Sequence, residues 1–546
     1  MFVRVKSTPN SPRKSVQIVE SVRDGEKVKQ RIVRHVGIAM DDQELEQLKI
    51  LAEHIKSKIE DERSPLLFPP EKLAKIALDS KKQKDEDLFV NLKELKEEQR
   101  TIVGIHDIYG KIYQELGFDS ILPQKTGELL RNIVMARIAN PSSKRASVID
   151  LEQNFGISLN LDRVYRMMDK LDETACKNIR KNAFRTTCEL FDDKIDVVFV
   201  DATTLYFESF TEDTLKKNGY SKDLKFNQPQ VLLALLVTKQ GLPIGYEVFP
   251  GSTYEGNMLL PLLEKLKEEH AIDKLIFVAD SAMFNEKNLT LLEEAGYEYI
   301  VGARLRNLPK DLKDEVVNIS QYTTSSQHDD ATISLRELTH NNRRLIISHS
   351  TKRARKDAHD RNEAVEKLRK KIGKNKNPAQ LISNYGYKKF LKVKGESSVS
   401  LDEEKLNEAA KWDGLHGVIT NSETLESKEI LAQYRGLWQV EESFRITKHD
   451  LKVRPIFHWT PERVQAHIAI CFMAFTCVRN LEYRAVLQYK KMSPEAIRKA
   501  LIGVQTSILR HLNGNRYAIP SDVSQEARKL YQIMGKKYST TPYRVK

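Results

Sequence analysis

Apolar positions in the N-terminal part of the chain follow a strand period and then a helix period. Two alternating segments in residues 16–37 flank Asp24-Gly25, a dipeptide that accepts the positive φ angles of a tight turn. From Asp41 to Ile59, apolar residues recur at spacings of three and four, which is typical of an amphipathic helix, and similar spacing continues further along. We therefore expect a basic β-hairpin and helices in residues 1–100, with a solvated linker, SKKQKDED, at residues 80–87, and an all-helical region in residues 101–190.

The hydrophobic period changes at Ile195. The β-branched run IDVVFV leads to Asp201, two more apolar strands and a helix follow, and the run KLIFVAD stops at Asp280. A strand, a hairpin, a helix and another strand in this order predict an α/β core with a mixed sheet.

The predicted core is divided by a long insertion. Residues 301–424 contain amphipathic strands and a helix in Lys352–Lys376, which has eleven Lys or Arg residues and four acidic residues. That helix is either a solvated face or a surface that follows phosphates. We expect a β-rich basic insertion between core segments 191–300 and 425–490, and a helical C-terminal region in residues 491–546 that is a candidate for pairing protomers.

Composition narrows the class of protein. The 546 residues are 30% charged and 40% hydrophobic, and 89 basic residues exceed 76 acidic ones, which gives a formal net charge of +13. This excess favours polyanionic partners, nucleic acid first. The most apolar stretch, 464–478, is shorter than the roughly 20 residues that span a bilayer, so we expect a buried helix and no membrane.

Cysteine usage and the N-terminus point to the cytoplasm. Four cysteines without a CxxC pair favour neither a disulfide scaffold nor a zinc or redox site. The segment MFVRVKSTPN has no apolar stretch of the kind found in signal peptides. Three histidines in the C-terminal half, at spacings of nine residues, fit no compact zinc pattern: His449, His458 and His467.

Three acidic residues carry the candidate chemistry. Asp201 and Asp280 each end, or nearly end, an apolar strand, and carboxylates at such places can cluster to bind hard cations. Either aspartate alone is more simply a cap on a turn. The third is Glu441, in YRGLWQVEESFRITKHDL, where a single helix would place it on one apolar stripe with Trp438 and Phe444. A carboxylate on a core-facing stripe requires a partner, and a metal ion is one.

These residues and their surroundings resemble a known family. Asp201, Asp280 and Glu441 match the Asp-Asp-Glu triad of insertion-sequence transposases with a ribonuclease-H-like catalytic core. The resemblance extends to GYSKD, PQVLLALLVTKQGLPIGYEVFPGSTYEGN, VADSAMF, WDGLHGVITN and RPIFHWTPERVQAHIAICFMAF. It implies an α/β fold with a mixed sheet interrupted by a β-rich insertion, with an N-terminal β-hairpin plus helical region and a helical C-terminus.

One group of this family carries Tyr, Arg, Glu and Lys at fixed spacing around the glutamate. Tyr434, Glu441 and Lys448 match, whereas Leu437 stands at the arginine position and Arg435 lies nearby. The resemblance implies that Tyr434 and Lys448 contact DNA.

Trp412, in the insertion, is the candidate for the aromatic residue that supports an unstacked base in related enzymes. The simpler alternative is a core tryptophan beside the Asp413-Gly414 turn.

The implied activity is DNA transposition. The triad would bind two Mg²⁺ ions, with Mn²⁺ as a substitute, to cleave an element's ends and join them to target DNA. Double-stranded DNA is the implied partner, a homodimer the implied assembly, and a bacterial or archaeal cytoplasm, at the nucleoid, the implied location. End recognition is expected in residues 1–190, where RNIVMARIANPSSKRAS is a candidate to grip phosphates.

Other classes remain open at this point. They are a ribonuclease-H-like nuclease without strand joining, a decayed transposase that only binds DNA, and a phosphatase-like hydrolase. The last fits the two strand-end aspartates but not the basic insertion or the Tyr, Glu, Lys helix.

Overall fold

The N-terminal unit is a small sheet covered by one helix. In this computed structural model, β1 (Phe2–Ser7), β2 (Lys14–Asp24) and β3 (Lys27–Ala39) form an antiparallel sheet, and α1 (Asp42–Glu62) packs against all three strands. Asp24 pairs with Lys27, which confirms the hairpin. The structure describes residues 1–7, 13–24, 27–39, 42–62, 90–191, 195–208, 211–219, 228–269, 275–281, 285–328, 331–374, 390–394 and 398–545. The turn residue Gly25 and the linker SKKQKDED lie outside these ranges.

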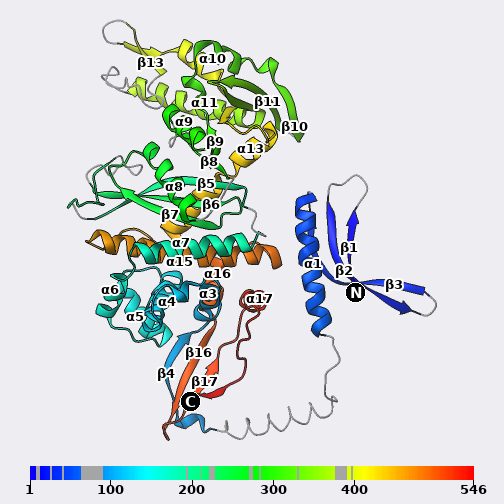
Figure 1. Cartoon of the computed structure of the whole chain (residues 1–546), viewed down its shortest axis with the longest axis vertical. Helices are drawn as coiled ribbons and strands as arrows, with labels where there is room; N and C mark the ends of the chain where they lie inside the picture. The colour runs from blue at the N-terminus through cyan, green and yellow to red at the C-terminus, as the bar shows by residue number, and fades with distance from the viewer. Residues whose placement is uncertain are drawn as a thin grey trace.

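Five helices follow a strand that opens the next segment. They are α3 (Gly104–Glu115), α4 (Gln124–Ala139), α5 (Lys144–Phe155), α6 (Leu161–Met168) and α7 (Glu173–Glu189). Four of them, α3, α4, α6 and α7, pack against α15 (Pro461–Gln488) (Figure 1). By length and composition α15 could cross a membrane, yet 89% of its apolar window is buried inside the protein, as in a core helix.

A nine-stranded mixed sheet forms the centre of the chain. Its order is β10-β11-β12-β15-β9-β8-β5-β6-β7. Strand β5 (Val197–Tyr206) pairs antiparallel with β6 (Gln230–Thr238), which pairs antiparallel with β7 (Pro243–Pro250). On its other side β5 pairs parallel with β8 (Ile276–Ala279), which pairs parallel with β9 (Glu298–Gly302). The fold is therefore mixed α/β around a large mixed sheet. Helices α8 (Leu259–Glu269) and α9 (Glu286–Glu294) connect the strands, and Leu262, Leu263 and Leu292 from these helices join an apolar cluster with residues of the sheet.

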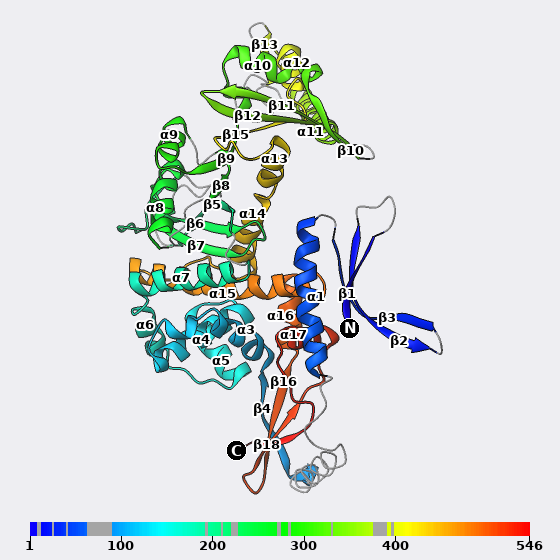
Figure 2. The ribbon, with the colours of Figure 1, turned by 45° about the vertical axis from the view of Figure 1, so that its right-hand side comes forward.

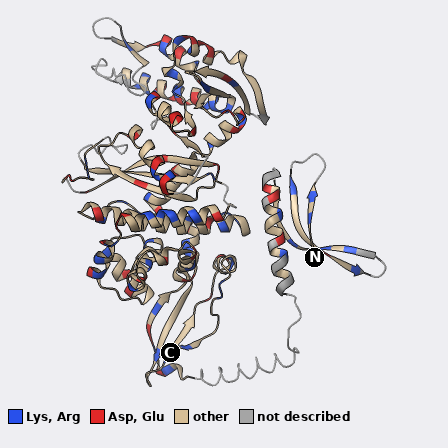
Figure 3. Cartoon of the chain, in the orientation of Figure 1, with Lys and Arg blue, Asp and Glu red and all other residues tan. Residues whose placement is uncertain are grey.

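The insertion extends this sheet instead of forming a separate one. β15 (Leu415–Thr420) pairs antiparallel with β9, so β12 (Arg343–Ser350), β11 (Ala331–His340) and β10 (Thr323–His328) continue the same sheet. The insertion also contains helices and a small hairpin: α10 (Lys310–Val317), α11 (Thr351–Lys374), α12 (Glu403–Ala410), β13 (Leu391–Lys394) and β14 (Ser398–Leu401). Figure 3 shows both basic and acidic side chains on α11, where Lys367 pairs with Glu363 and Arg369 with Glu366, which partly offsets the positive charge of the helix.

The expectation of a wholly helical C-terminus is wrong. Besides α16 (Pro494–Ile502) and α17 (Gln525–Ile533), this region contains β16 (Gln505–His511), β17 (Arg516–Pro520) and β18 (Tyr543–Val545). These strands form a four-stranded sheet with β4 (Leu95–Ile102), which precedes the helical segment. The pairing of β16 with β4 joins segments that lie far apart in the sequence, so the local pattern of neither segment predicts it.

Candidate active site

The two aspartates occupy equivalent positions on neighbouring strands. Val200 of β5 pairs with Ala279 of β8 in parallel register, and Asp201 and Asp280 follow these two residues. Asp280 comes directly after β8, as expected, and is exposed. Asp201 is half-buried and lies inside β5 instead of at its end, because β5 continues to pair with β6 as far as Tyr206. Parallel register therefore places both carboxylates at one level of the sheet.

Both aspartates have the same local geometry. An Oδ1 atom of Asp201 accepts the backbone N–H of Ala202 at 2.7 Å, and an Oδ1 atom of Asp280 accepts that of Ser281 at 2.7 Å. Each backbone N–H holds one oxygen of its carboxylate in place.

The glutamate segment is not the single helix that its apolar spacing predicts. It consists of α13 (Ser427–Arg435), α14 (Trp438–Arg445) and a π-helical turn over Ile446–Asp450. The break falls at Gly436, where an added Cβ would lie 2.5 Å from Cζ of Phe199. A glycine at this point lets the chain approach β5 two residues before Asp201. Figure 2 shows α13 and α14 running beside the central strands, where α13 contacts β8 and β9 and α14 contacts β5 and β6.

The predicted core-facing stripe is wrong in part, because α14 buries Val440, Ser443 and Phe444. Phe444 is buried, but Trp438 is 51% exposed and Glu441 is exposed as well. Glu442 is half-buried and accepts two hydrogen bonds from Arg445, which hold the pKa of its carboxyl below the usual range. Because Glu441 is exposed, burial of its charge does not require a metal ion or another partner.

Tyr434 connects two of the acidic residues. Its hydroxyl lies 3.5 Å from Oδ1 of Asp280, to which it donates a hydrogen bond. Burial raises the pKa of Tyr434, and the charges of Asp280 and Glu441 raise it further. The phenol is therefore neutral and keeps its proton to donate, and Glu441 lies within electrostatic reach of the same side chain.

His416 is a site residue that the sequence did not single out. Its ring lies 5.1 Å from the ring of Tyr434, centroid to centroid. Burial lowers the pKa of His416 to about 4, and the positive charges of Arg353 and Arg435 act in the same direction. The imidazole is therefore neutral near pH 7. Its position inside WDGLHGVITN was the available signal, since that run belongs to the resemblance.

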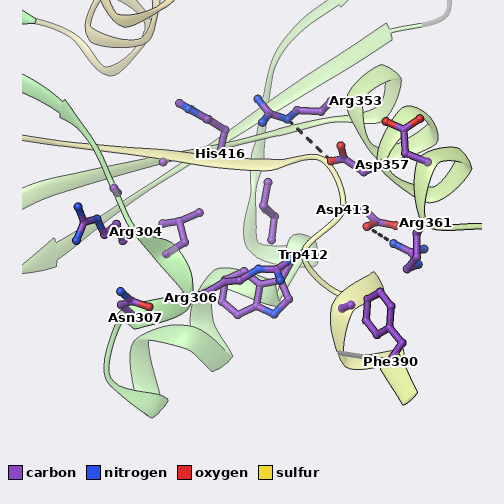
Figure 4. A pocket seen from close by; sticks show the side chains of 16 residues that line it. Arg304, Arg306, Asn307, Arg353, Asp357, Arg361, Phe390, Trp412, Asp413 and His416 are labelled. Carbon is purple, nitrogen blue, oxygen red and sulfur yellow. Dashed lines mark hydrogen bonds and ion pairs between the residues drawn. The ribbon is translucent and has the colours of Figure 1, made fainter. Parts of the chain in front are cut away.

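A cavity of about 750 Å³ opens beside these residues (Figure 4). Its wall includes His416 and four arginines, Arg304, Arg306, Arg353 and Arg361, of which Arg304 also donates a hydrogen bond to the carbonyl of Ser281 at 2.7 Å. Arg353 and Arg361 pair with Asp357 and Asp413 respectively. Through Arg304 the cavity wall reaches Ser281, the residue after Asp280, and the wall holds acidic as well as basic and aromatic side chains.

Trp412 packs as the core alternative expects, and its role in supporting a base stays a prediction. Its half-buried ring packs against the apolar cluster of the insertion and also lines the cavity. The guanidinium carbon of Arg306 lies 5.7 Å from the ring centroid, within cation–π distance. One ring face is therefore already engaged by a cation.

The remaining motif residues lie around the Glu helix. Lys448 is half-buried within the π-helical turn, and Leu437 is buried in the main core at 8% exposure. Arg435 is exposed, and its charge reaches His416. An arginine is thus available near the site at position 435, while position 437 belongs to the core.

The triad supplies the hard oxygen donors that divalent cations such as Mg²⁺ prefer. Among the residues that the structure describes, no group of three His, Cys, Asp or Glu side chains is already gathered closely enough to hold a metal ion. The donor chemistry therefore fits a divalent cation, and the sheet register brings two of the three carboxylates to neighbouring strands.

Comparisons with known proteins identify one family. Residues 192–477, more than half of the chain, match the family described as transposase DDE domain, and residues 2–66 match the N-terminal domain of the IS1634 family transposases. No curated protein matches. Among solved structures, a piggyBac transposase synaptic complex with hairpin DNA is similar at a TM-score of 0.36 and 8% identity, covering 73% of this chain and 76% of that one. A Mos1 transposase paired-end complex with the left transposon end is similar at a TM-score of 0.15 and 15% identity, covering 46% and 74%.

Proposed function

The chain belongs to the DDE transposases of insertion sequences, and from this premise we propose that it cleaves the ends of a DNA element and joins their 3′ ends to target DNA. Asp201, Asp280 and Glu441 are the proposed catalytic carboxylates. The observation that carries the assignment is the parallel register that brings Asp201 and Asp280 to the same level of two adjacent strands.

The strand arrangement supports a ribonuclease-H-like core. Three antiparallel strands, β5, β6 and β7, are followed by β8 and β9, which add parallel strands on the other side of β5. This arrangement is typical of the catalytic core that such transposases share. Glu441 then comes from a helix that packs on β5 and β6.

DDE transposases depend on divalent metal, and the proposed triad would hold it. We propose two Mg²⁺ ions, which Mn²⁺ would replace, bound by Asp201, Asp280 and Glu441. When bound, the metal supplies charge neutralisation and activation of an attacking water or 3′ hydroxyl group. The chain's own contribution is to fix the aspartates through the N–H groups of Ala202 and Ser281.

Three side chains are the proposed DNA contacts, and one of them, Tyr434, donates a hydrogen bond to Asp280. Tyr434 and Lys448 come from the Glu segment, and Trp412 lines the basic cavity in which an unstacked base would be supported. The net charge of +13 favours a polyanionic partner. Double-stranded DNA, a homodimer that holds two ends together, and a cytoplasmic location at the nucleoid complete the proposal. End recognition is assigned to residues 101–190.

The direct test uses the full chain and a labelled duplex that carries the flanking ends of its own gene. With Mg²⁺, we expect cleaved and joined products, and a chelator should remove both. Asp201→Asn, Asp280→Asn and Glu441→Gln should each lower product formation by about a hundredfold to a thousandfold, as loss of a principal charge-stabilising group does, while end binding changes little. Retained cleavage in any one variant would remove that residue from the triad.

Glu442→Gln is the matched control, because it removes the same charge one position along α14. It also removes one of the two ion-pair partners of Arg445 and leaves Asp450, so the melting temperature of the variant is measured beside its activity. Cleavage without joining in the wild-type chain would favour a nuclease, and binding with neither step would favour a DNA-binding protein without catalysis.

A further inference from the structure

A second basic pocket lies away from the proposed triad. It encloses about 130 Å³ between the start of α5 and the segment that leads from the π-helical turn to α15. Five basic residues line it: Arg137, Lys144, Arg145, Lys452 and Arg454. Within the part of the chain that the structure describes, the lining includes no Asp or Glu.

Two of these cations are almost completely buried beside neutral partners. Lys144 and Arg137 are each only 3% exposed. The Nζ atom of Lys144 lies 3.3 Å from Nδ1 of His467, and Arg137 donates to the backbone carbonyls of Leu451 at 3.4 Å and Lys452 at 3.3 Å. Burying a cation without an opposite charge is costly, because it loses its hydration shell. An anion inside the pocket would supply the missing charge.

The titration of neighbouring groups reflects this excess of positive charge. Burial lowers the pKa of Lys144 to about 7, and the charge of Arg137 lowers it further. Burial and the charge of Lys144 likewise lower the pKa of His458 to about 3 and hold that of His467 far below its usual range. Without an anion, the pocket therefore favours the neutral forms of Lys144, His458 and His467. A bound anion would raise the pKa of Lys144 and favour its charged form.

The surroundings of the pocket fit a nucleic acid better than a free ion. Phe457 lines the pocket at 58% exposure, and Trp459, two residues further, is 74% exposed. Exposed aromatic rings beside a basic groove are the combination that contacts bases and phosphates together. The first turn of α5 also starts here, since Ser143 is its N-cap, and the positive end of the helix dipole favours an anion.

We propose that this pocket, lined by Arg137, Lys144, Arg145, Lys452 and Arg454, binds a backbone phosphate of DNA outside the catalytic centre. This assignment rests on the proposed function, because it takes DNA as the ligand. The shared chemistry is a tetrahedral phosphate oxyanion, and inorganic phosphate is the alternative source. Seated between the helical segment and the end of the Glu segment, the phosphate would link DNA binding by residues 101–190 to the catalytic core.

The first arm of the test uses inorganic phosphate and the substitution Lys144→Met. Methionine keeps the length of the side chain and removes the buried amine. If Lys144 has no anion to bind, the melting temperature of Lys144→Met should equal or exceed that of the wild-type chain, because replacing a buried charge by an apolar side chain is often neutral or stabilising. Phosphate also stabilises proteins in general through exclusion from their surface, so the melting temperature is compared at equal ionic strength in phosphate and in chloride for both proteins. We expect phosphate to raise the melting temperature of the wild-type chain by more than that of Lys144→Met.

The second arm measures DNA binding by fluorescence anisotropy over a range of salt concentrations. The double variant Arg145→Gln/Lys452→Gln removes two exposed charges of the pocket, and Lys499→Gln/Arg510→Gln removes two exposed charges that do not line it. We expect the pocket variant to bind at least tenfold more weakly than the control, with a salt slope shallower by about 2.

Each outcome decides a different point. Equal binding by the two double variants, together with a phosphate effect lost in Lys144→Met, would assign the pocket to free phosphate and overturn the DNA assignment. Equal binding with equal phosphate effects in wild type and Lys144→Met would overturn the anion site altogether. If the wild-type chain binds no DNA, the proposed function fails, and the phosphate arm still decides whether the pocket takes an anion.

Discussion

The hydroxyl group of Tyr434 lies 3.5 Å from a carboxylate oxygen of Asp280, and the charge of Glu441 reaches the same phenol. The raised pKa of Tyr434 keeps its proton in place, so the phenol is a donor to a carboxylate at neutral pH. Tyr434 is thus a candidate for orienting Asp280 as well as for touching DNA.

Tyr434→Phe should therefore slow strand cleavage by roughly tenfold, in line with the loss of one hydrogen bond of about 1.4 kcal/mol. The melting temperature should change little, because the ring remains. Pre-steady-state cleavage at saturating Mg²⁺ is the measurement. Tyr254→Phe, at an exposed tyrosine outside the site, is the control. Equal cleavage rates for Tyr434→Phe and wild type would refute an orienting role.

His416 predicts a dependence of stability on pH. Its pKa is about 4 in the folded protein against an ordinary value of 6.5, so the unfolded chain binds the proton more readily between these two values. The contribution of His416 to the free energy of unfolding is fully present above pH 6.5. It is lost as the pH falls toward 4, by up to about 1.4 kcal/mol per pH unit.

Urea unfolding at about pH 7 and about pH 5 tests this expectation. His416→Gln should lose less stability between the two values than the wild-type chain. His359→Gln, at a histidine whose side chain is 72% exposed, should behave as wild type. Parallel losses in wild type and His416→Gln would contradict the burial of a neutral imidazole.

Trp412 offers a test of the cavity in the insertion. If the ring supports an unstacked base, Trp412→Ala should reduce cleavage of intact duplex ends by on the order of tenfold, since stacking on an aromatic ring contributes about 1–3 kcal/mol per base. A duplex with an unpaired base at the cleavage point should restore part of the rate. Full cleavage of intact ends by Trp412→Ala would leave the ring with a packing role only.

A buried ion pair joins the helical segment to the catalytic core. Arg180 of α7 donates two hydrogen bonds to Glu269 at the end of α8, at 2.6 and 3.1 Å, and the two side chains are 5% and 4% exposed. Glu269→Gln should cost about 3–5 kcal/mol of unfolding free energy, because it leaves a buried guanidinium with less opposing charge. Glu189→Gln, which breaks the exposed pair of Arg185 and Glu189, should cost under about 0.5 kcal/mol. Equal costs in urea unfolding would contradict the difference in burial.

The local sequence predicts some parts of this architecture and not others. The apolar runs before Asp201 and Asp280 predict buried strands, because β-branched residues in short runs suit a central sheet. The break at Gly436 was not predictable, because it depends on the approach of Phe199 from a strand much earlier in the chain. The apolar spacing also made Glu441 look buried, whereas α14 buries Val440, Ser443 and Phe444 and leaves Glu441 exposed. His416 was missed for the same kind of reason, since burial and the distant charges of Arg353 and Arg435 set its pKa.

The departure of Leu437 from the family motif gives the last prediction. Leu437 is 8% exposed in the main core, whereas Arg435 is exposed and lies close enough to act on His416. Leu437→Arg should therefore destabilise the chain by about 2–4 kcal/mol, because it forces a charge into an apolar environment. It should not raise cleavage. Arg435→Gln should keep the fold and weaken binding of element ends by about tenfold, because a phosphate contact of about 1.4 kcal/mol is lost. Urea unfolding and anisotropy on the same duplex measure both effects. A Leu437→Arg variant with wild-type stability and faster cleavage would show instead that position 437 is where the arginine acts.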